Sequence, residues 1–214
     1  MQLREGGHFS MTDLKRADAP IISSPAGIVT ALVTPFDEDE KLDYGAWRVI
    51  IETLIAEGVH GLFVAGGQGE FFALDDAERV DVLRFCRKAV DGRVPVYGNV
   101  GCITTRASVR LAQAAEAEGI DYLVAITPYY LKPSEDELVA HYVAICRAAR
   151  RPLFAYSIPE RTGLTLTPTA VARISAQCEN FAGLKDSTGD LKQLPALLEA
   201  APDRRLVVFM GRDH

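Results

Sequence analysis

A lysine closes a short apolar run in the stretch FAGLKDSTGD, where Phe181 to Leu184 lead into Lys185. Lysine is almost never buried unless it is paired or has a chemical task. Burial disfavours the ammonium form, and a neutral amine attacks a ketone to form a Schiff base that serves as an electron sink. The alternative is a lysine that snorkels out of a strand end and pairs with Asp186. The lysine alone does not separate these two interpretations.

Other apolar runs are also followed by groups that could do chemistry. AYSIPERTG contains Tyr156, a phenol suited to proton transfer, and Arg161, a guanidinium that binds carboxylates through two hydrogen bonds. ITPYYLKP contains Tyr129 and Tyr130, and VAGGQGEFF is a turn whose backbone N–H groups can approach an anion. Each has a structural explanation when taken alone, because tyrosines often pack in cores, arginines cap surface loops and glycine-rich turns are common.

Seven short apolar runs precede these groups and are typical of strands buried on both faces, since they are rich in Val, Ile, Phe and Tyr. They cover residues 28–34, 61–66, 94–100, 121–127, 152–158, 181–185 and 206–210.

Five amphipathic patterns between these runs predict helices. They cover residues 43–58, 75–90, 104–119, 134–150 and 167–178. Ser134 followed by Glu137 is a capping box, and Thr167 with Pro168 is typical of a helix start.

Strands and helices thus alternate with a near-constant spacing, which predicts an α/β protein built either as a doubly wound sheet or as a (β/α)8 TIM barrel. Phe72 stands where a dinucleotide-binding turn has its third glycine, so no nucleotide fingerprint supports the doubly wound alternative. The sequence favours the barrel, apparently truncated after the seventh strand. We therefore expect an open gap between residues 28–34 and 206–210, because direct pairing there would close a seven-stranded barrel instead.

The domain prediction is a disordered N-terminal tail over 1–25 and a C-terminally incomplete barrel catalytic domain over 26–214. A net charge of −6 gives no basic surface for nucleic acid or an acidic membrane. No run approaches the roughly 18 apolar residues of a membrane helix, and the polar first twenty residues do not resemble a signal peptide. Four scattered cysteines without a C-x-x-C pair indicate reduced thiols and a cytoplasmic location, and no residues have metal-ligand spacing.

Six motifs in this frame together resemble one family. They are TALVTPF (30–36), GGQGE (66–70, for the family's G-T-T-G-E), PYY (128–130), YSIPERTG (156–163, for Y-N-x-P-x-R-T-G), GLKDSTGD (183–190) and GRD (211–213, for the start of S-G-D-D). From about Gly27 to its C-terminus the chain resembles the dihydrodipicolinate synthase and N-acetylneuraminate lyase family of class I, pyruvate-dependent aldolases.

The resemblance implies a catalytic role for three residues. Lys185 would condense with the keto carbon of pyruvate or another 2-keto acid, and the covalent imine would need no added cofactor or metal. Tyr156 would shuttle protons during imine formation and carbon–carbon bond chemistry. Tyr130 would reach into the site of a neighbouring subunit, so the resemblance also implies a homo-oligomer, either a homotetramer or a dimer.

The resemblance implies substrate binding by four further residues. The backbone of Gly67 and Gln68 would hold the pyruvyl carboxylate, Arg161 would hold a carboxylate on a second substrate such as an aldehyde, and Gly211 would lie beside them. The implied activity is that of a carbon–carbon or carbon–oxygen lyase. It would be similar to 4-hydroxy-tetrahydrodipicolinate synthase or to a keto-deoxy sugar acid aldolase or dehydratase.

Three positions depart from the family pattern. Gly67 and Gln68 stand where the family has two threonines, and Ser157 stands where it has asparagine. The second threonine links the two tyrosines through its hydroxyl, so a proton relay here would run through the Gln68 amide, through water, or not at all. The alternative function is therefore a non-catalytic barrel that binds 2-keto acids.

Overall fold

The computed structural model describes residues 25–201 and 206–212, so the predicted disordered tail lies almost entirely outside the described residues. Each of the seven predicted apolar runs contains a strand. The strands are β1 (Val29–Ala31), β2 (Gly61–Val64), β3 (Val96–Asn99), β4 (Tyr122–Ile126), β5 (Leu153–Ser157), β6 (Phe181–Asp186) and β7 (Val207–Met210). All are parallel and pair in chain order from β1 to β7. This order confirms the barrel prediction, because a doubly wound sheet reverses its strand order at one point.

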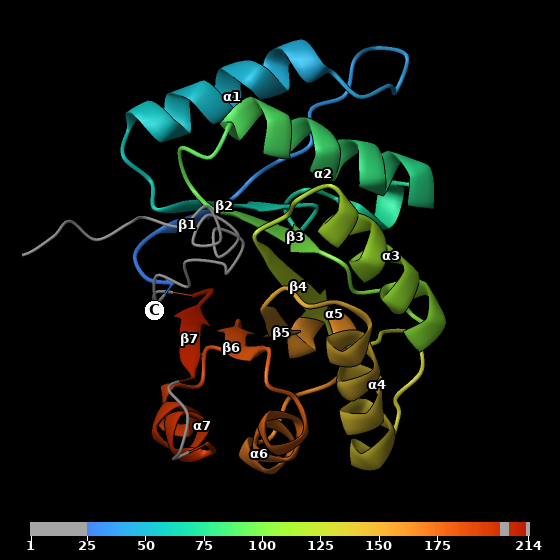
Figure 1. Ribbon diagram of the computed structural model, residues 1–214, viewed down its shortest axis with the longest axis vertical. Helices are drawn as coiled ribbons and strands as arrows, with labels where there is room; N and C mark the ends of the chain where they lie inside the picture. The colour runs from blue at the N-terminus through green and yellow to red at the C-terminus, as the bar shows by residue number, and fades with distance from the viewer. Residues whose placement is uncertain (1–24, 202–205, 213–214) are drawn as a thin grey trace, which may run out of the picture.

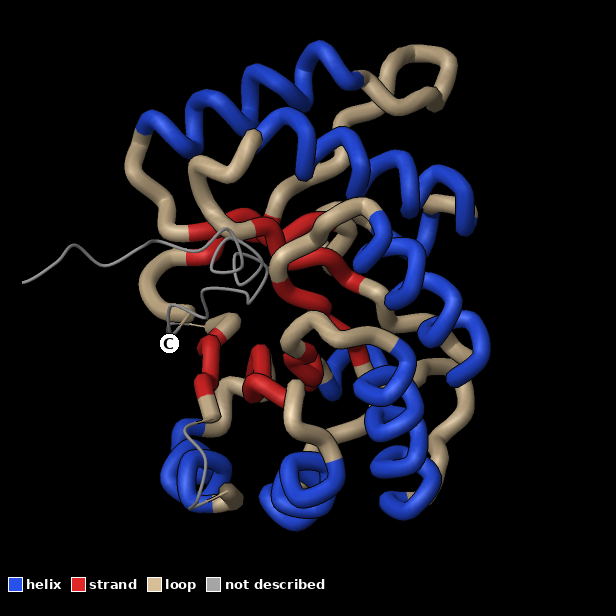
Figure 2. Tube along the Cα trace, viewed as in Figure 1, coloured by secondary structure: helices blue, strands red, loops and turns tan. Residues whose placement is uncertain are grey.

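Except for the short helix that follows β5, the helices lie outside the curved sheet (Figures 1 and 2). They are α1 (Tyr44–Ala56), α2 (Asp76–Val90), α3 (Thr105–Ala117), α4 (Glu135–Ala148), α5 (Pro159–Thr162), α6 (Pro168–Gln177) and α7 (Leu194–Glu199). The sequence analysis missed α5, α7 and the 3₁₀ turns η2 (Phe71–Ala73) and η3 (Leu191–Gln193). These segments are too short to show a helical period.

Side-chain caps fix where the long helices begin. In the predicted capping box of α4, the Ser134 hydroxyl accepts a hydrogen bond from the Glu137 N–H, and the Glu137 carboxylate accepts one from the Ser134 N–H. Asp75 and Glu78 form a second capping box at α2. The Thr167 hydroxyl caps α6 as predicted. Each such cap contributes about 1 kcal/mol to stability.

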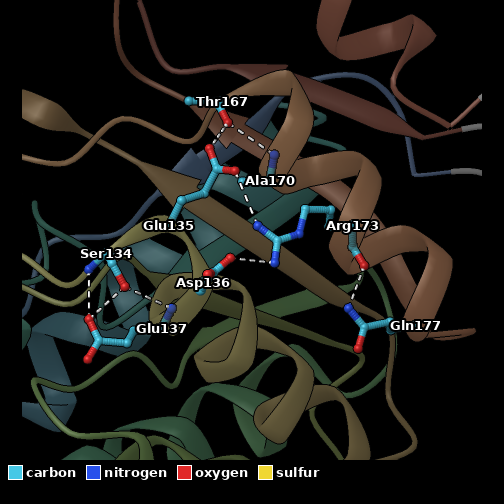
Figure 3. A network of polar contacts seen from close by, with 8 residues as sticks. All are labelled: Ser134, Glu135, Asp136, Glu137, Thr167, Ala170, Arg173 and Gln177. Atoms are coloured by element: carbon cyan, nitrogen blue, oxygen red, sulfur yellow. Dashed lines mark hydrogen bonds and ion pairs between the residues drawn. The ribbon is translucent and has the colours of Figure 1, made fainter.

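An ion-pair network joins α4 to α6 on the outer surface (Figure 3). The Arg173 guanidinium donates to the carboxylates of Glu135 at 3.3 Å and Asp136 at 2.6 Å. Glu135 also accepts a hydrogen bond from the Thr167 hydroxyl. The network therefore ties the start of α4 to the start of α6.

The chain's single tryptophan lies between helices α1 and α2. Trp47 of α1 is fully buried and stacks on Phe85 of α2 with ring centroids 5.7 Å apart. Its indole N–H has no hydrogen-bond partner among the described residues. The packing of α1 against α2 is thus apolar around this side chain.

A β-bulge shifts the register between β5 and β6. Leu153 pairs with Phe181, but Phe154 pairs with Gly183, so Ala182 is the extra residue. Gly183 has φ +145°, and a Cβ atom there would lie 1.9 Å from the Val207 carbonyl oxygen of β7. Glycine is therefore required for β7 to approach β6.

The two end strands each have one partner within the described part of the chain. β1 pairs only with β2 and β7 only with β6, and no ladder joins β1 to β7. The predicted gap between these strands is confirmed, and direct closure into a seven-stranded barrel is excluded for the described residues. Over the described ranges no helix has the length and apolar content needed to cross a bilayer.

Candidate active site

Lys185 lies near the carboxyl end of β6, as the apolar run predicted. The register places it beside Tyr156 of β5 and Phe209 of β7. Its Nζ lies 3.8 Å from the centre of the Tyr156 ring and 5.2 Å from that of Phe63. These aromatic faces exclude water from the amine while leaving it without a carboxylate neighbour.

The alternative pairing of Lys185 with Asp186 is wrong. Successive strand residues point to opposite faces, so Asp186 is directed away from Lys185. The Asp186 carboxylate accepts hydrogen bonds from the Thr188 N–H at 2.9 Å and the Thr188 hydroxyl at 3.0 Å. No ion pair of Lys185 occurs among the described residues.

Burial lowers the pKa of Lys185 from its ordinary value of 10.5 to about 8. The cause is desolvation, which disfavours the charged ammonium. The neutral amine, which is the state that attacks a carbonyl carbon, is therefore far more populated near physiological pH than in an exposed lysine.

Tyr156 is buried at the end of β5 with its hydroxyl facing the turn after β2. A Cβ atom built on Gly67 would lie 3.8 Å from this hydroxyl. Burial raises the pKa of Tyr156, while a hydrogen bond from Ser187 and the charges of Arg161 and Arg212 oppose that rise. The phenol thus stays protonated at neutral pH and is able to donate its proton to a neighbouring oxygen.

The Gly66–Glu70 turn after β2 is held from two sides. The Thr34 hydroxyl donates to the Gly69 carbonyl at 2.7 Å, and the Asn99 amide donates to the Ala65 carbonyl at 2.8 Å. The N–H groups of Gly67 and Gln68 have no acceptor among the described residues. These two donors are therefore available to an anion.

Arg161 lies on α5, directly after β5. Its side chain is exposed and forms no ion pair in the part of the chain that the structure describes. The short helix is anchored by Thr162, whose hydroxyl accepts from the Thr127 hydroxyl of the β4 end at 2.9 Å. Arg161 thus lies on an anchored helix, and its guanidinium has no ion-pair partner among the described residues.

The end of β7 brings two more residues to the same region. The Gly211 N–H donates to the Asp186 carbonyl, and a Cβ atom on Gly211 would lie 2.0 Å from the Ser187 hydroxyl oxygen. Arg212 follows and forms an ion pair with Glu160 of α5. The third residue of this motif, Asp213, lies outside the described residues.

One cavity of about 1000 Å³ brings the predicted residues together at the carboxyl ends of the strands. Six of the seven predicted site residues line it, namely Gly67, Gln68, Tyr156, Arg161, Lys185 and Gly211. This is the position at which barrel enzymes bind their substrates.

Tyr130 is the predicted site residue that does not line this cavity. It is 90% exposed, and its backbone has a positive φ of 78°. Its neighbour Tyr129 lines the cavity instead and packs edge-to-face on Phe71, with ring centroids 5.8 Å apart. Within one chain, Tyr130 and Lys185 are therefore not brought together.

The sequence analysis missed the residues that position the site. Thr34, Asn99 and Thr127 act through hydrogen bonds to segments more than thirty residues away. Ser187 and Arg212 line the cavity, and although both lie within the quoted motifs GLKDSTGD and GRD, the sequence analysis assigned neither a role. Their place after β6 and β7 was the available signal, because functional side chains of barrels gather after strands.

No metal centre is built from the described residues, since they contain no group of three or more His, Cys, Asp or Glu side chains placed to hold an ion. The four cysteines are buried and form no disulfide among the described residues. The Cys102 thiol accepts a hydrogen bond from the buried Arg79 guanidinium at 3.1 Å.

A sequence comparison matches residues 24–214 to the dihydrodipicolinate synthetase family. Among relatives, a 4-hydroxy-tetrahydrodipicolinate synthase from Chelativorans sp. (strain BNC1) is 40% identical over 188 residues, which are 87% of this chain and 64% of that protein. The enzyme of that name from Bacillus subtilis (strain 168) is 33% identical over 186 residues, again 87% and 64%. The chain thus spans slightly less than two thirds of the length of these relatives.

Solved structures show the same architecture. A chloride-inhibited dihydrodipicolinate synthase from Acinetobacter baumannii, in complex with pyruvate, has a TM-score of 0.84 and 31% identity over 88% of this chain and 64% of that one. A prophage protein of the dihydrodipicolinic acid synthase family from E. coli K12, also in complex with pyruvate, has a TM-score of 0.83 and 33% identity over 86% and 63%.

Proposed function

Because the chain belongs to the dihydrodipicolinate synthetase family, we propose that it is a Schiff-base-forming lyase or aldolase that acts on pyruvate or another 2-keto acid. The observation that carries the proposal is a lysine amine of lowered pKa in a cavity lined by a phenol, two free backbone N–H groups and an unpaired arginine. A neutral amine is the nucleophile of imine chemistry, and the other groups would bind the carboxylates of a 2-keto acid and transfer protons to it.

In the proposed first step, the neutral Lys185 amine attacks the keto carbon. The N–H groups of Gly67 and Gln68 bind the adjacent carboxylate and so hold the keto carbon near Nζ. Tyr156 donates a proton to the departing hydroxyl, water leaves, and the protonated imine remains at Lys185.

The imine then acts as an electron sink. Loss of a proton from the neighbouring carbon gives an enamine, which attacks the carbonyl carbon of a second substrate, and the reverse sequence cleaves that bond. Expulsion of a hydroxyl group one carbon further on would give a dehydratase instead. Arg161 would bind a carboxylate on the part of the substrate beyond the imine.

The test is reductive trapping. Protein is incubated with pyruvate and sodium borohydride, digested and analysed by mass spectrometry. We expect the reduced pyruvyl adduct on Lys185, whereas the exposed Lys88 and Lys192 serve as internal controls without it. Lys185→Arg keeps the charge but is unable to form the imine, so it should carry no adduct. An adduct elsewhere, or none on the folded protein, would refute the proposal.

A second candidate function, a non-catalytic barrel that binds 2-keto acids, is favoured by the residue types of Gly67 and Gln68. Neither supplies the hydroxyl that links the two tyrosines in the family, and Tyr130 does not line the cavity of its own chain. A pyruvate adduct on Lys185 without turnover of any aldehyde or sugar acid would support this candidate over the lyase.

We further propose that residues 26–214 form the barrel catalytic unit and that it assembles as a homo-oligomer in which Tyr130 completes a neighbouring site. The 90% exposure of Tyr130 supports this assembly. A cytoplasmic location remains a prediction, supported by four cysteines that form no disulfide among the described residues.

A further inference from the structure

The cavity has more cationic side chains than the binding of pyruvate would use. Its lining contains three cationic side chains, Lys185, Arg161 and Arg212, and no acidic side chain among the described residues. Lys185 would be used in the imine, and the pyruvyl carboxylate would be held by backbone N–H groups. Arg161 and Arg212 are then both available to the part of the substrate beyond the imine.

Arg212 follows β7 and lies on the same side of the cavity as the phenol. Its charge, together with that of Arg161, acts on the Tyr156 hydroxyl. Among the described residues its acidic partner is Glu160, which does not itself line the cavity. The Arg212 guanidinium therefore lies at the cavity and pairs with an acidic side chain that is outside the cavity.

The ion pair with Glu160 is easily exchanged. The Arg212 side chain is 30% exposed and the Glu160 side chain 61% exposed. Exposed pairs contribute little net stability, because water solvates both partners when they separate. A substrate carboxylate that entered the cavity could replace Glu160 at small cost and gain the planar, two-point hydrogen bonding that arginine offers.

We infer that Arg212 is a specificity-determining residue that, with Arg161, binds a second anionic group on the substrate, so that the site prefers 2-keto dicarboxylates to 2-keto monocarboxylates. The inference rests on the proposed function, because it uses Lys185 as the group that holds the keto carbon. Glu160 is the exchangeable partner that keeps Arg212 in place when no dianion is bound.

The experiment compares two keto acids of equal carbon number. 2-Oxoglutarate and 2-oxopentanoate differ only in the terminal carboxylate, and both can be trapped on Lys185 with borohydride. The half-saturating concentration of each gives a ratio within one protein preparation, so partial unfolding cancels. We expect the protein to favour 2-oxoglutarate on the order of tenfold, as a gained charge-assisted hydrogen-bond pair predicts.

Substitutions assign that preference to one side chain. Arg212→Gln should reduce the ratio severalfold, Arg212→Lys should restore part of it, and Glu160→Gln should increase it by removing the competing carboxylate. Arg173→Gln is the matched control, because it removes one charge and breaks an acidic ion pair at a site outside the cavity. Its ratio should equal that of the unchanged protein.

Two results would overturn the inference. One is equal half-saturation by the two keto acids, and the other is a preference that survives Arg212→Gln but is lost in Arg161→Gln. If pyruvate labels Lys185 while either result holds, only this inference fails. If no keto acid labels Lys185, the proposed function fails as well.

Discussion

At the scale of single residues, the reactivity of Lys185 depends on what surrounds it. The rings of Tyr156 and Phe63 lie against the amine, and its strand neighbour Asp186 is turned to the other face and bonded to Thr188. The amine is desolvated without gaining a carboxylate that would restore its charge. Its lowered pKa follows from this geometry and leads to two predictions.

The first prediction concerns pH. Only the neutral amine forms the imine, so the rate of pyruvate trapping on folded protein should rise with pH and level off above about 8, the pKa of Lys185. In protein unfolded by urea, the same lysine should level off only near its ordinary value of 10.5. The measurement is trapping by cyanoborohydride across this range, expressed as the ratio of folded to unfolded rates. A ratio that does not change between pH 7 and 10 would contradict the lowered pKa.

The second prediction concerns stability. Because the folded state binds the Lys185 proton more weakly than the unfolded state, folding bears the full cost of charging the buried amine below pH 8 and none above about 10.5. Replacing the lysine by methionine should therefore stabilise the protein at pH 7, by up to roughly 3 kcal/mol. The gain should shrink as pH rises from 8 to 10.5.

Urea unfolding at pH 7 and pH 10 measures this gain. Lys88→Met, at an exposed position in the last turn of α2, is the control and should change stability little at either pH. A Lys185→Met protein that is less stable than the original at pH 7 would show that the amine has a stabilising partner instead.

At the scale of elements, the bulge in β6 aligns the site. It skips Ala182, so that Lys185 comes to lie opposite Tyr156 and next to Phe209. Gly183 permits the bulge because it adopts φ +145° and leaves room for the Val207 carbonyl oxygen. The alignment of the lysine with the phenol therefore depends on a residue that contacts neither.

We predict that Gly183→Ala will destabilise the protein by about 3 kcal/mol or more, since its Cβ atom would lie 1.9 Å from the Val207 oxygen and force β7 away from β6. Gly58→Ala is the matched control. Gly58 also has positive φ, at 81°, but a Cβ atom there would meet nothing within 4 Å, so the cost should be about 1 kcal/mol. Equal losses in urea unfolding would show that crowding at Val207 is relieved without cost.

The sequence predicted the strands and the position of Lys185, but it did not predict the bulge or the distant hydrogen-bonded pairs that position the site. The strands were predictable because buried parallel strands are continuous apolar runs, and the lysine because it interrupts one of them. The bulge was not predictable, because the register of a strand depends on how it pairs with its neighbours and not on its own sequence pattern. Thr34 and Thr127 were missed for a related reason, since each bonds to a residue 35 positions away. The pairing of Arg212 with Glu160 spans 52 positions and follows only from the closing curve of the sheet.

At the scale of the whole molecule, two exposed side chains follow the cavity-lining Tyr129 along the chain. Tyr130 is 90% exposed and Leu131 71% exposed, on the loop between β4 and α4. A surface of this kind is typical of protein–protein contacts, where tyrosine is enriched. The exposure of these two side chains supports the proposed assembly.

We predict that the protein sediments as a dimer or larger homo-oligomer and that Tyr130→Ser combined with Leu131→Ser shifts it to smaller species. Val49→Ser should leave the sedimentation unchanged, because Val49 is 66% exposed on α1 and equally apolar. Analytical ultracentrifugation over a range of concentrations makes the comparison. Monomeric behaviour of the unsubstituted protein would contradict the assembly and leave Tyr130 without its proposed role.

The burial of Trp47 between α1 and α2 gives the protein one built-in optical reporter. Because its indole is fully buried and has no hydrogen-bond partner among the described residues, this single fluorophore should emit at short wavelength in the folded state and shift to longer wavelength on unfolding. Because it does not line the cavity, keto-acid binding should leave its emission unchanged. Fluorescence would therefore follow the integrity of the fold independently of the chemistry, so that a substitution that damages the site is distinguished from one that damages the protein.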